Sequence, residues 1–126
     1  MTLQYAKALL EAAEKLATER GLSLSMAVVD RHAHLIAFHR LDGAMLGTRD
    51  VAPRKAVTST LFPMPSGDFG DLCRREALDG MMHSNGGLMG FPGGHPLPDG
   101  GAIGISGGTA QEDAAIALAA IAVCTS

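Results

Sequence analysis

The glycines of residues 93–108 constrain the fold of this chain most, because they occur at positions that suit turns instead of being scattered along the segment. Asp99-Gly100 lies between two short apolar segments and is a strong signal for a two-residue hairpin turn. Thr109 and Glu112 have the spacing of a capping box that opens the Ala- and Ile-rich C-terminal segment. The pattern therefore predicts strand, turn, strand, glycine turn and helix, with backbone amides near Ser106 free to face a ligand.

Length and charge exclude several classes of protein. The 126 residues suit one domain. The net charge is −3 and the Lys and Arg residues are dispersed, so the sequence shows no basic patch that would bind nucleic acid. The N-terminal residues begin a charged amphipathic segment instead of a signal peptide, and no apolar run approaches a membrane span. We therefore expect a cytoplasmic protein that binds neither nucleic acid nor membrane.

Periodicity and breaker residues give the order of elements. Apolar residues at helical spacing predict a helix over residues 2–20, and two β-prone segments, 23–30 and 34–40, predict a hairpin. Pro53 is tolerable only near a first turn, so the next helix is predicted to start near Val51. A further helix over residues 68–80, the glycine hairpin and the last helix follow.

The resulting order is α-β-β-α-α-β-β-β-α. It lacks the regular strand–helix alternation of a doubly wound parallel sheet, so we expect an α/β (α+β) fold with an antiparallel sheet covered by helices. The segment 114–123 is apolar all round, which predicts burial on several sides, under a sheet and in a subunit contact. A homo-oligomer is therefore expected.

One apparent catalytic motif is rejected. Residues 104–108 match the G-x-S-x-G pattern of a nucleophile elbow around Ser106. Only 18 residues follow, however, and none of them is a histidine, so the triad order of that fold cannot be completed. The segment is better interpreted as a glycine-lined turn or as a ligand cradle.

The five histidines offer candidate ligands and proton carriers. His32 and His34 form an H-x-H pair that a third imidazole, from His83 or His95, would complete as a metal or haem site. His83 and His95 are better placed, because both lie beside glycine-rich loops. His39 is the third candidate for acid–base chemistry. The alternative is that His83 and His95 are solvated loop residues, that His32 sits in a turn, and that His34 and His39 point to opposite faces of a strand.

Charged residues cluster after the second predicted strand. Arg40 or Lys55 is a candidate to bind a carboxylate or a propionate, and Asp42 is a candidate partner for either. The alternative is a structural ion pair that pins the turn to the following helix.

These segments together resemble the GlcG/HbpS family, which includes haem-binding proteins and the C-terminal domain of PduO-type corrinoid adenosyltransferases. Four ordered blocks carry the resemblance over nearly the whole chain: residues 27–44, the A-x-x-K-A-x-T block of residues 52–58, Gly93-Gly94-His95-Pro96-Leu97, and residues 104–108 followed by Asp113. The resemblance implies a single domain over residues 1–126 with a profilin-like antiparallel sheet of about five strands, assembled as a homo-oligomer. The usual paired glycine after Asp30 is replaced by His32-Ala33.

Two functional hypotheses follow, beside the alternative of a purely structural or regulatory subunit whose glycine loops are filled by a partner chain. The first is a small-molecule-binding protein, with haem or another tetrapyrrole in a pocket between residues 81–94 and a neighbouring subunit, and with His83 or His95 as the iron ligand. The expected ligand-binding residues are Arg40, Asp42, Lys55, Gly93, Gly94, Ser106, Gly107 and Gly108. The second is a cofactor-independent enzyme acting on a small organic acid or aromatic, with His39, His83 or His95 as general acid or base.

Overall fold

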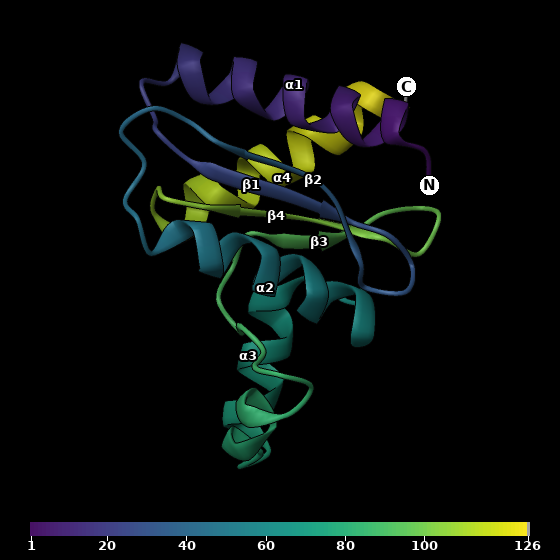
Figure 1. Cartoon of the computed structure of the whole chain (residues 1–126). Helices are drawn as coiled ribbons and strands as arrows, with labels where there is room; N and C mark the ends of the chain where they lie inside the picture. Colours follow the sequence, from purple (N-terminus) through teal and green to yellow (C-terminus); the bar gives the residue numbers. More distant parts are fainter. Residues whose placement is uncertain (126) are drawn as a thin grey trace.

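The computed structural model describes residues 1–125 of the chain (Figure 1). Its elements in chain order are α1 (Leu3–Glu19), β1 (Ser25–Val29), β2 (Leu35–Arg40), α2 (Thr48–Leu61), α3 (Ser66–Arg75), the 3₁₀ helix η1 (Asp79–His83), β3 (Gly94–Pro96), β4 (Ala102–Ser106) and α4 (Ala110–Thr125). The mixed α/β class, the antiparallel sheet and the order of elements are confirmed. The described residues form four strands rather than five, and η1 takes up the stretch before β3.

The sheet has the order β2-β1-β4-β3, with every pair antiparallel. Helices α1 and α4 cover one face and α2 covers the other, while α3 and η1 extend away from the sheet (Figure 1). Side chains alternate between the two faces. Met26, Val28, Ile103 and Ile105 enter the main core with α1 and α4, so the residues between them face α2.

Glycine on the α2 face of the sheet lets the helix approach closely. A methyl group at Gly104 would overlap the carbonyl oxygen of Ala52 on α2, so only glycine fits there. The helix therefore lies directly on β4. Lys55, one turn further along α2, is carried beneath the end of that strand.

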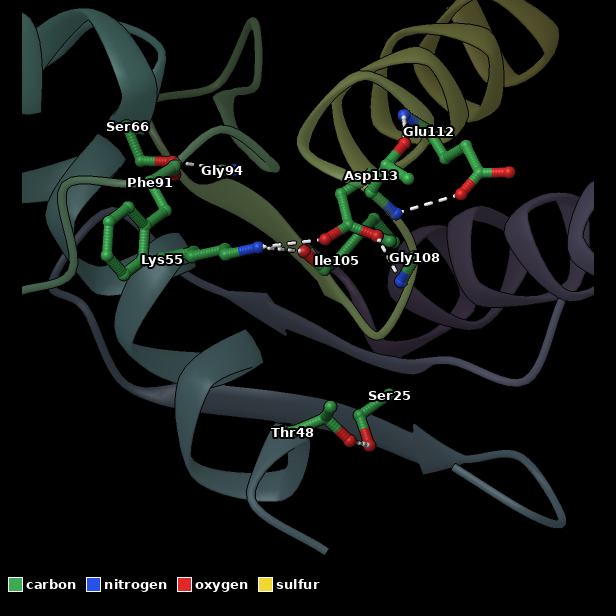
Figure 2. A network of polar contacts seen from close by, with 11 residues as sticks. Ser25, Thr48, Lys55, Ser66, Phe91, Gly94, Ile105, Gly108, Glu112 and Asp113 are labelled. Atoms are coloured by element: carbon green, nitrogen blue, oxygen red, sulfur yellow. Dashed lines mark hydrogen bonds and ion pairs between the residues drawn. The ribbon is translucent and has the colours of Figure 1, made fainter. Parts of the chain in front are cut away.

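Helix α2 begins at Thr48, so the predicted start near Val51 is wrong by one turn. The first turn is built from overlapping backbone bonds, including Thr48 N–H to Met45 and Asp50 N–H to Gly47. Thr48 also donates its hydroxyl to the Met45 carbonyl and pairs with Ser25 at 2.8 Å (Figure 2). These contacts start the helix early, and Pro53 falls inside it.

The helix predicted over residues 68–80 is shorter and earlier, because α3 ends at Arg75 and Ala77 adopts a positive φ of 56°. That left-handed residue turns the chain before η1.

The last helix is buried on one side only. Ile116, Ala117 and Ala120 pack into the core, whereas Leu118 is 50% exposed. The expected burial of α4 on several sides is therefore not met within one copy of the chain, and the homo-oligomer stays a prediction.

Candidate functional site

The sequence-predicted site residues line four separate hollows instead of one. We name them the lysine hollow, the apolar hollow, the His95 hollow and the His39 hollow. Phe91 lines both the lysine hollow and the apolar hollow, and Pro92 lines both the lysine hollow and the His95 hollow. The segment before β3 therefore separates the glycine turn, His83 and His95 from one another.

The lysine hollow, of about 260 Å³, lies between α2 and the turn that precedes α4. Its polar lining comes from Thr48, Lys55, Ser106, Gly107, Gly108 and Asp113, and its apolar lining includes Met45, Val51, Phe91 and Pro92. Three of the predicted ligand-binding positions besides Lys55 thus share this hollow: Ser106, Gly107 and Gly108. Gly93 and Gly94 line the His95 hollow instead, although Gly93 also lies beside the Lys55 amine and Gly94 packs against the Lys55 backbone.

A buried ion pair stands at the end of the lysine hollow. The Nζ of Lys55 donates to the Ile105 carbonyl at 2.8 Å and to Oδ2 of Asp113 at 3.1 Å (Figure 2). Each of the two charged side chains is only 4% exposed. Burial lowers the pKa of Lys55, and the Asp113 carboxylate acts in the opposite direction. Lys55 pairs with Asp113, so of the two candidate partners of Asp42, Arg40 and Lys55, the lysine is excluded.

The same carboxylate organises the glycine turn. Oδ1 of Asp113 accepts the Gly108 N–H at 2.9 Å, and Gly107 has a φ of +135°, which favours glycine. The predicted capping box is confirmed, because Thr109 N–H donates to Oε1 of Glu112 and Glu112 N–H donates to Oγ1 of Thr109. The first turn of α4 thus carries two carboxylates with different roles, since Asp113 pairs with Lys55 and Glu112 caps the helix.

The apolar hollow, of about 360 Å³, lies where α3, η1 and residues 88–91 meet. Its walls include Gly70, Cys73, Met82, Leu88, Met89 and Phe91. Arg74, Asp79 and His83 supply the charged and polar lining. His83 has no hydrogen-bond or ion-pair partner among residues 1–125, so both of its ring nitrogens are available.

The other two candidate histidines lie elsewhere. His95 lines a hollow of about 270 Å³ together with Asp68, Asp71 and Leu118, and its Nδ1 lies 3.2 Å from the Pro96 carbonyl oxygen. His39 lines a hollow of about 360 Å³ at the β2 edge of the sheet, with Glu14, Phe38, Arg40, Leu41 and Asp42. The predicted residues Arg40 and Asp42 therefore belong with His39 and not with Lys55.

The H-x-H pair does not form a metal site. His32 lies in the β1–β2 turn and His34 just before β2, with ring centroids 6.4 Å apart. Backbone N–H groups of His34 and His32 bind the Asp30 carboxylate and lower its pKa. Across the described part of the chain, no three His, Cys, Asp or Glu side chains are grouped to hold a metal ion.

Sequence reasoning missed two contributors. Asp113 was noticed as part of a motif but not as the partner of Lys55, and Arg74 was not singled out at all. A lysine in an Ala-rich helix that packs on a sheet is expected to be buried, and a buried charge needs a charged partner. A search for a carboxylate could therefore have led to Asp113. Nothing in the local pattern distinguishes Arg74 from its neighbour Arg75.

Comparison with known proteins places this geometry in a family. Residues 1–122 match the family model described as haem degrading protein HbpS-like. The chain belongs to the HbpS-like family. The resemblance noted from the sequence is thereby confirmed. Within residues 1–125 no helix has the length and apolarity needed to cross a membrane.

Individual relatives agree with this assignment. The corrinoid adenosyltransferase PduO of Salmonella typhimurium is 32% identical over 120 residues, which cover 90% of this chain and 36% of that protein. The chain thus spans about a third of the length of this relative. The crystal structure of Klebsiella pneumoniae protein ORFY has a TM-score of 0.94 at 27% identity, covering 100% of this chain and 91% of that one.

A third relative carries a ligand. The crystal structure of a PduOC:heme complex has a TM-score of 0.89 at 28% identity and covers 97% of this chain and 93% of that chain. Haem is thus a ligand of a protein that shares the fold of this HbpS-like chain over nearly its whole length.

Proposed function

We propose that this HbpS-like chain is a haem-binding protein that holds the porphyrin in the apolar hollow, with His83 as the iron ligand. The observation that carries the proposal is the chemistry of the hollow. Met82, Leu88, Met89 and Phe91 offer an apolar surface for a flat ring, and the His83 imidazole stands beside them without another partner. An imidazole is a common axial ligand of haem iron.

Charge at the edge of the hollow also fits the group. Arg74 lines the hollow, and its guanidinium retains donors beyond the one that binds Asp71. It is therefore the residue we expect to hold a propionate. Asp79 lines the same hollow and disfavours a second propionate near it. When bound, the haem iron would supply electron-transfer or oxygen chemistry, and the chain would supply orientation, an apolar surface and the imidazole.

His95 is the weaker candidate for the same role. Its hollow contains the carboxylates of Asp68 and Asp71, which repel haem propionates. Its Nδ1 also lies close to a backbone carbonyl, so only the other ring nitrogen is free for iron.

A second copy of the chain would complete the pocket. A haem is larger than the 360 Å³ hollow, and Phe91 beside it is 58% exposed. We therefore expect a homo-oligomer in which a neighbouring subunit covers the outward part of the porphyrin. A cytoplasmic location stays a prediction.

Titration of the purified chain with hemin tests the proposal. We expect a saturable shift of the Soret band, loss of axial ligation in His83→Ala, and weaker binding in Arg74→Gln. His83 and Arg74 are exposed, so these substitutions should leave stability within about 0.5 kcal/mol. His95→Ala and His32→Ala serve as controls that should titrate like the parent. No Soret shift in the parent, or loss of ligation in His95→Ala alone, would refute the assignment.

The alternative function, acid–base catalysis without a cofactor, is supported by one observation. The His39 hollow brings an imidazole and the Arg40 guanidinium to one surface, the combination that a carboxylate substrate requires. Its test is a crystal soaked with a small carboxylate, together with turnover assays on His39→Ala. An empty hollow and unchanged turnover would remove it.

A further inference from the structure

The lysine hollow contains a nucleophile that the proposed haem site does not use. We propose that Lys55 forms an imine with a small aldehyde or ketone that enters this hollow. Lys55 is the buried lysine of the chain, whereas the other two, Lys7 and Lys15, lie exposed on α1. The proposal does not depend on haem, because its residues line a different hollow.

The geometry around the nitrogen suits an amine nucleophile. A neutral amine has two N–H bonds and one lone pair, and Nζ of Lys55 makes two hydrogen bonds, to Ile105 and Asp113. Among residues 1–125 it has no third partner. The neutral form can therefore keep both protein contacts and still present a lone pair, while burial of the side chain lowers the pKa of Lys55 and favours that form.

The hollow beside the amine also selects the ligand class. Ser106 lines the hollow and is only 6% exposed, and its side-chain hydroxyl has no hydrogen-bond partner within the described residues. Its hydroxyl can bind the oxygen of a carbonyl compound. Met45 and Val51 provide apolar contact for a short alkyl group, and the volume of about 260 Å³ admits only a small molecule.

Charge argues against an anion in the same place. Lys55 and Asp113 are the charged side chains that line the hollow, and they are paired with each other. An added carboxylate or phosphate would find the positive charge already paired and would lie beside the Asp113 carboxylate. A neutral carbonyl compound avoids this repulsion.

The reaction balances without an added oxidant or reductant. The Lys55 nitrogen attacks the carbonyl carbon, a C–N bond forms, and the carbonyl electron pair moves to oxygen. Asp113, which accepts a hydrogen bond from Nζ, is placed to take a proton from nitrogen and return it to that oxygen. The C–O bond then breaks, water leaves with the second proton, and the carbon–nitrogen double bond of the imine remains.

Reductive trapping tests this inference. The full chain would be incubated with limiting acetaldehyde or acetone and sodium cyanoborohydride near neutral pH, and the alkylated lysines would be located by peptide mass mapping. We expect Lys55 to be alkylated about tenfold faster than Lys7 or Lys15, a modest gain for a reactant held in place. Alkylation of Lys7 and Lys15 with Lys55 unmodified would overturn the proposal.

A substitution in the lysine hollow shows whether labelling of Lys55 requires the carbonyl compound to enter the hollow or reflects only the reactivity of its amine. Val51→Phe should fill the hollow and slow labelling of Lys55 about tenfold while labelling of Lys7 stays unchanged. Circular dichroism before labelling shows whether the variant is folded, and Ser106→Ala provides a milder change in the same hollow. Labelling of Lys55 that is as fast in both folded variants as in the parent would contradict binding in the lysine hollow.

Discussion

The Lys55–Asp113 pair gives the sharpest prediction, through the substitution Asp113→Asn. Asparagine keeps an oxygen for the Gly108 N–H but removes the charge that faces Lys55. The Lys55 side chain is 4% exposed, so its ammonium would be left almost without solvent or counter-charge. The variant therefore isolates the charge of Asp113 from its capping role.

The expected loss is large for a domain of this size. Breaking a buried pair by removing one partner costs about 3–5 kcal/mol. We take about 3 kcal/mol, because the amide keeps one hydrogen bond and Lys55 can release its proton. The free energy of unfolding of a typical domain is about 5–15 kcal/mol, so this loss is a large part of the total. It corresponds to a fall in Tm of about 10 °C.

The loss should depend on pH in a defined direction. Burial lowers the pKa of Lys55 below its ordinary value of 10.5, so the folded chain binds fewer protons there than the unfolded chain. The stability contributed by Lys55 is therefore present above pH 10.5 and is lost as the pH falls through the lowered pKa. Without the Asp113 carboxylate that pKa falls further, so the difference between variant and parent should shrink as the pH rises.

Urea unfolding followed by far-UV circular dichroism measures both effects, at about pH 7 and about pH 10. Asp50→Asn is the matched control, because Asp50 forms an exposed pair with Arg54 and should lose at most about 1 kcal/mol. Replacing both buried partners, with Lys55→Met and Asp113→Leu, should restore part of the loss. A cost below about 0.5 kcal/mol in Asp113→Asn, with no dependence on pH, would refute the reasoning.

Three further predictions concern packing and titration. Gly104→Ala should destabilise the fold by about 2–3 kcal/mol in thermal unfolding, because the added methyl group would overlap Ala52. The control Gly47→Ala adds a methyl group in open space and should be close to neutral. Equal effects of the two substitutions would contradict the close approach of α2. Ser59→Ala should leave stability unchanged or raise it, since the buried Ser59 hydroxyl has no hydrogen-bond partner. Thr58→Val should cost about 1–3 kcal/mol, because the Met89 N–H loses its acceptor. The reverse order of stabilities in urea unfolding would contradict this prediction. The stability that Asp30 contributes should be present above pH 3.8 and fall as the pH drops through its lowered pKa, so Asp30→Asn should flatten the acid limb of the stability profile, and an unchanged limb would exclude that role.

The fold was largely predictable because its signals are local. The capping box of Thr109 and Glu112 and the periodic first helix each act over a few residues, and both are found in the structure. A hairpin turn also forms around Asp99-Gly100, but the Leu97 N–H binds the Gly101 carbonyl, so the loop has three residues, 98–100, and the predicted two-residue turn is wrong. The errors also have local causes. Pro53 suggested a late start for α2, but contacts of Thr48 with Met45 and Ser25 begin the helix earlier.

The site was less predictable because it depends on contacts distant in sequence. Lys55 and Asp113 are 58 residues apart, and no spacing rule links them. Asp42 was a candidate partner for either Arg40 or Lys55, and the structure places it in the His39 hollow with Arg40. The division of His83, His95 and Ser106 among three hollows follows from the path of Phe91 and Pro92, which only the three-dimensional fold reveals.

A crystal structure of the chain grown with hemin tests the central claim most directly. The account predicts porphyrin density against Met82, Met89 and Phe91, with a ring nitrogen of His83 bonded to the iron. Porphyrin bound at His95 or at the H-x-H turn, with the apolar hollow empty, would contradict it.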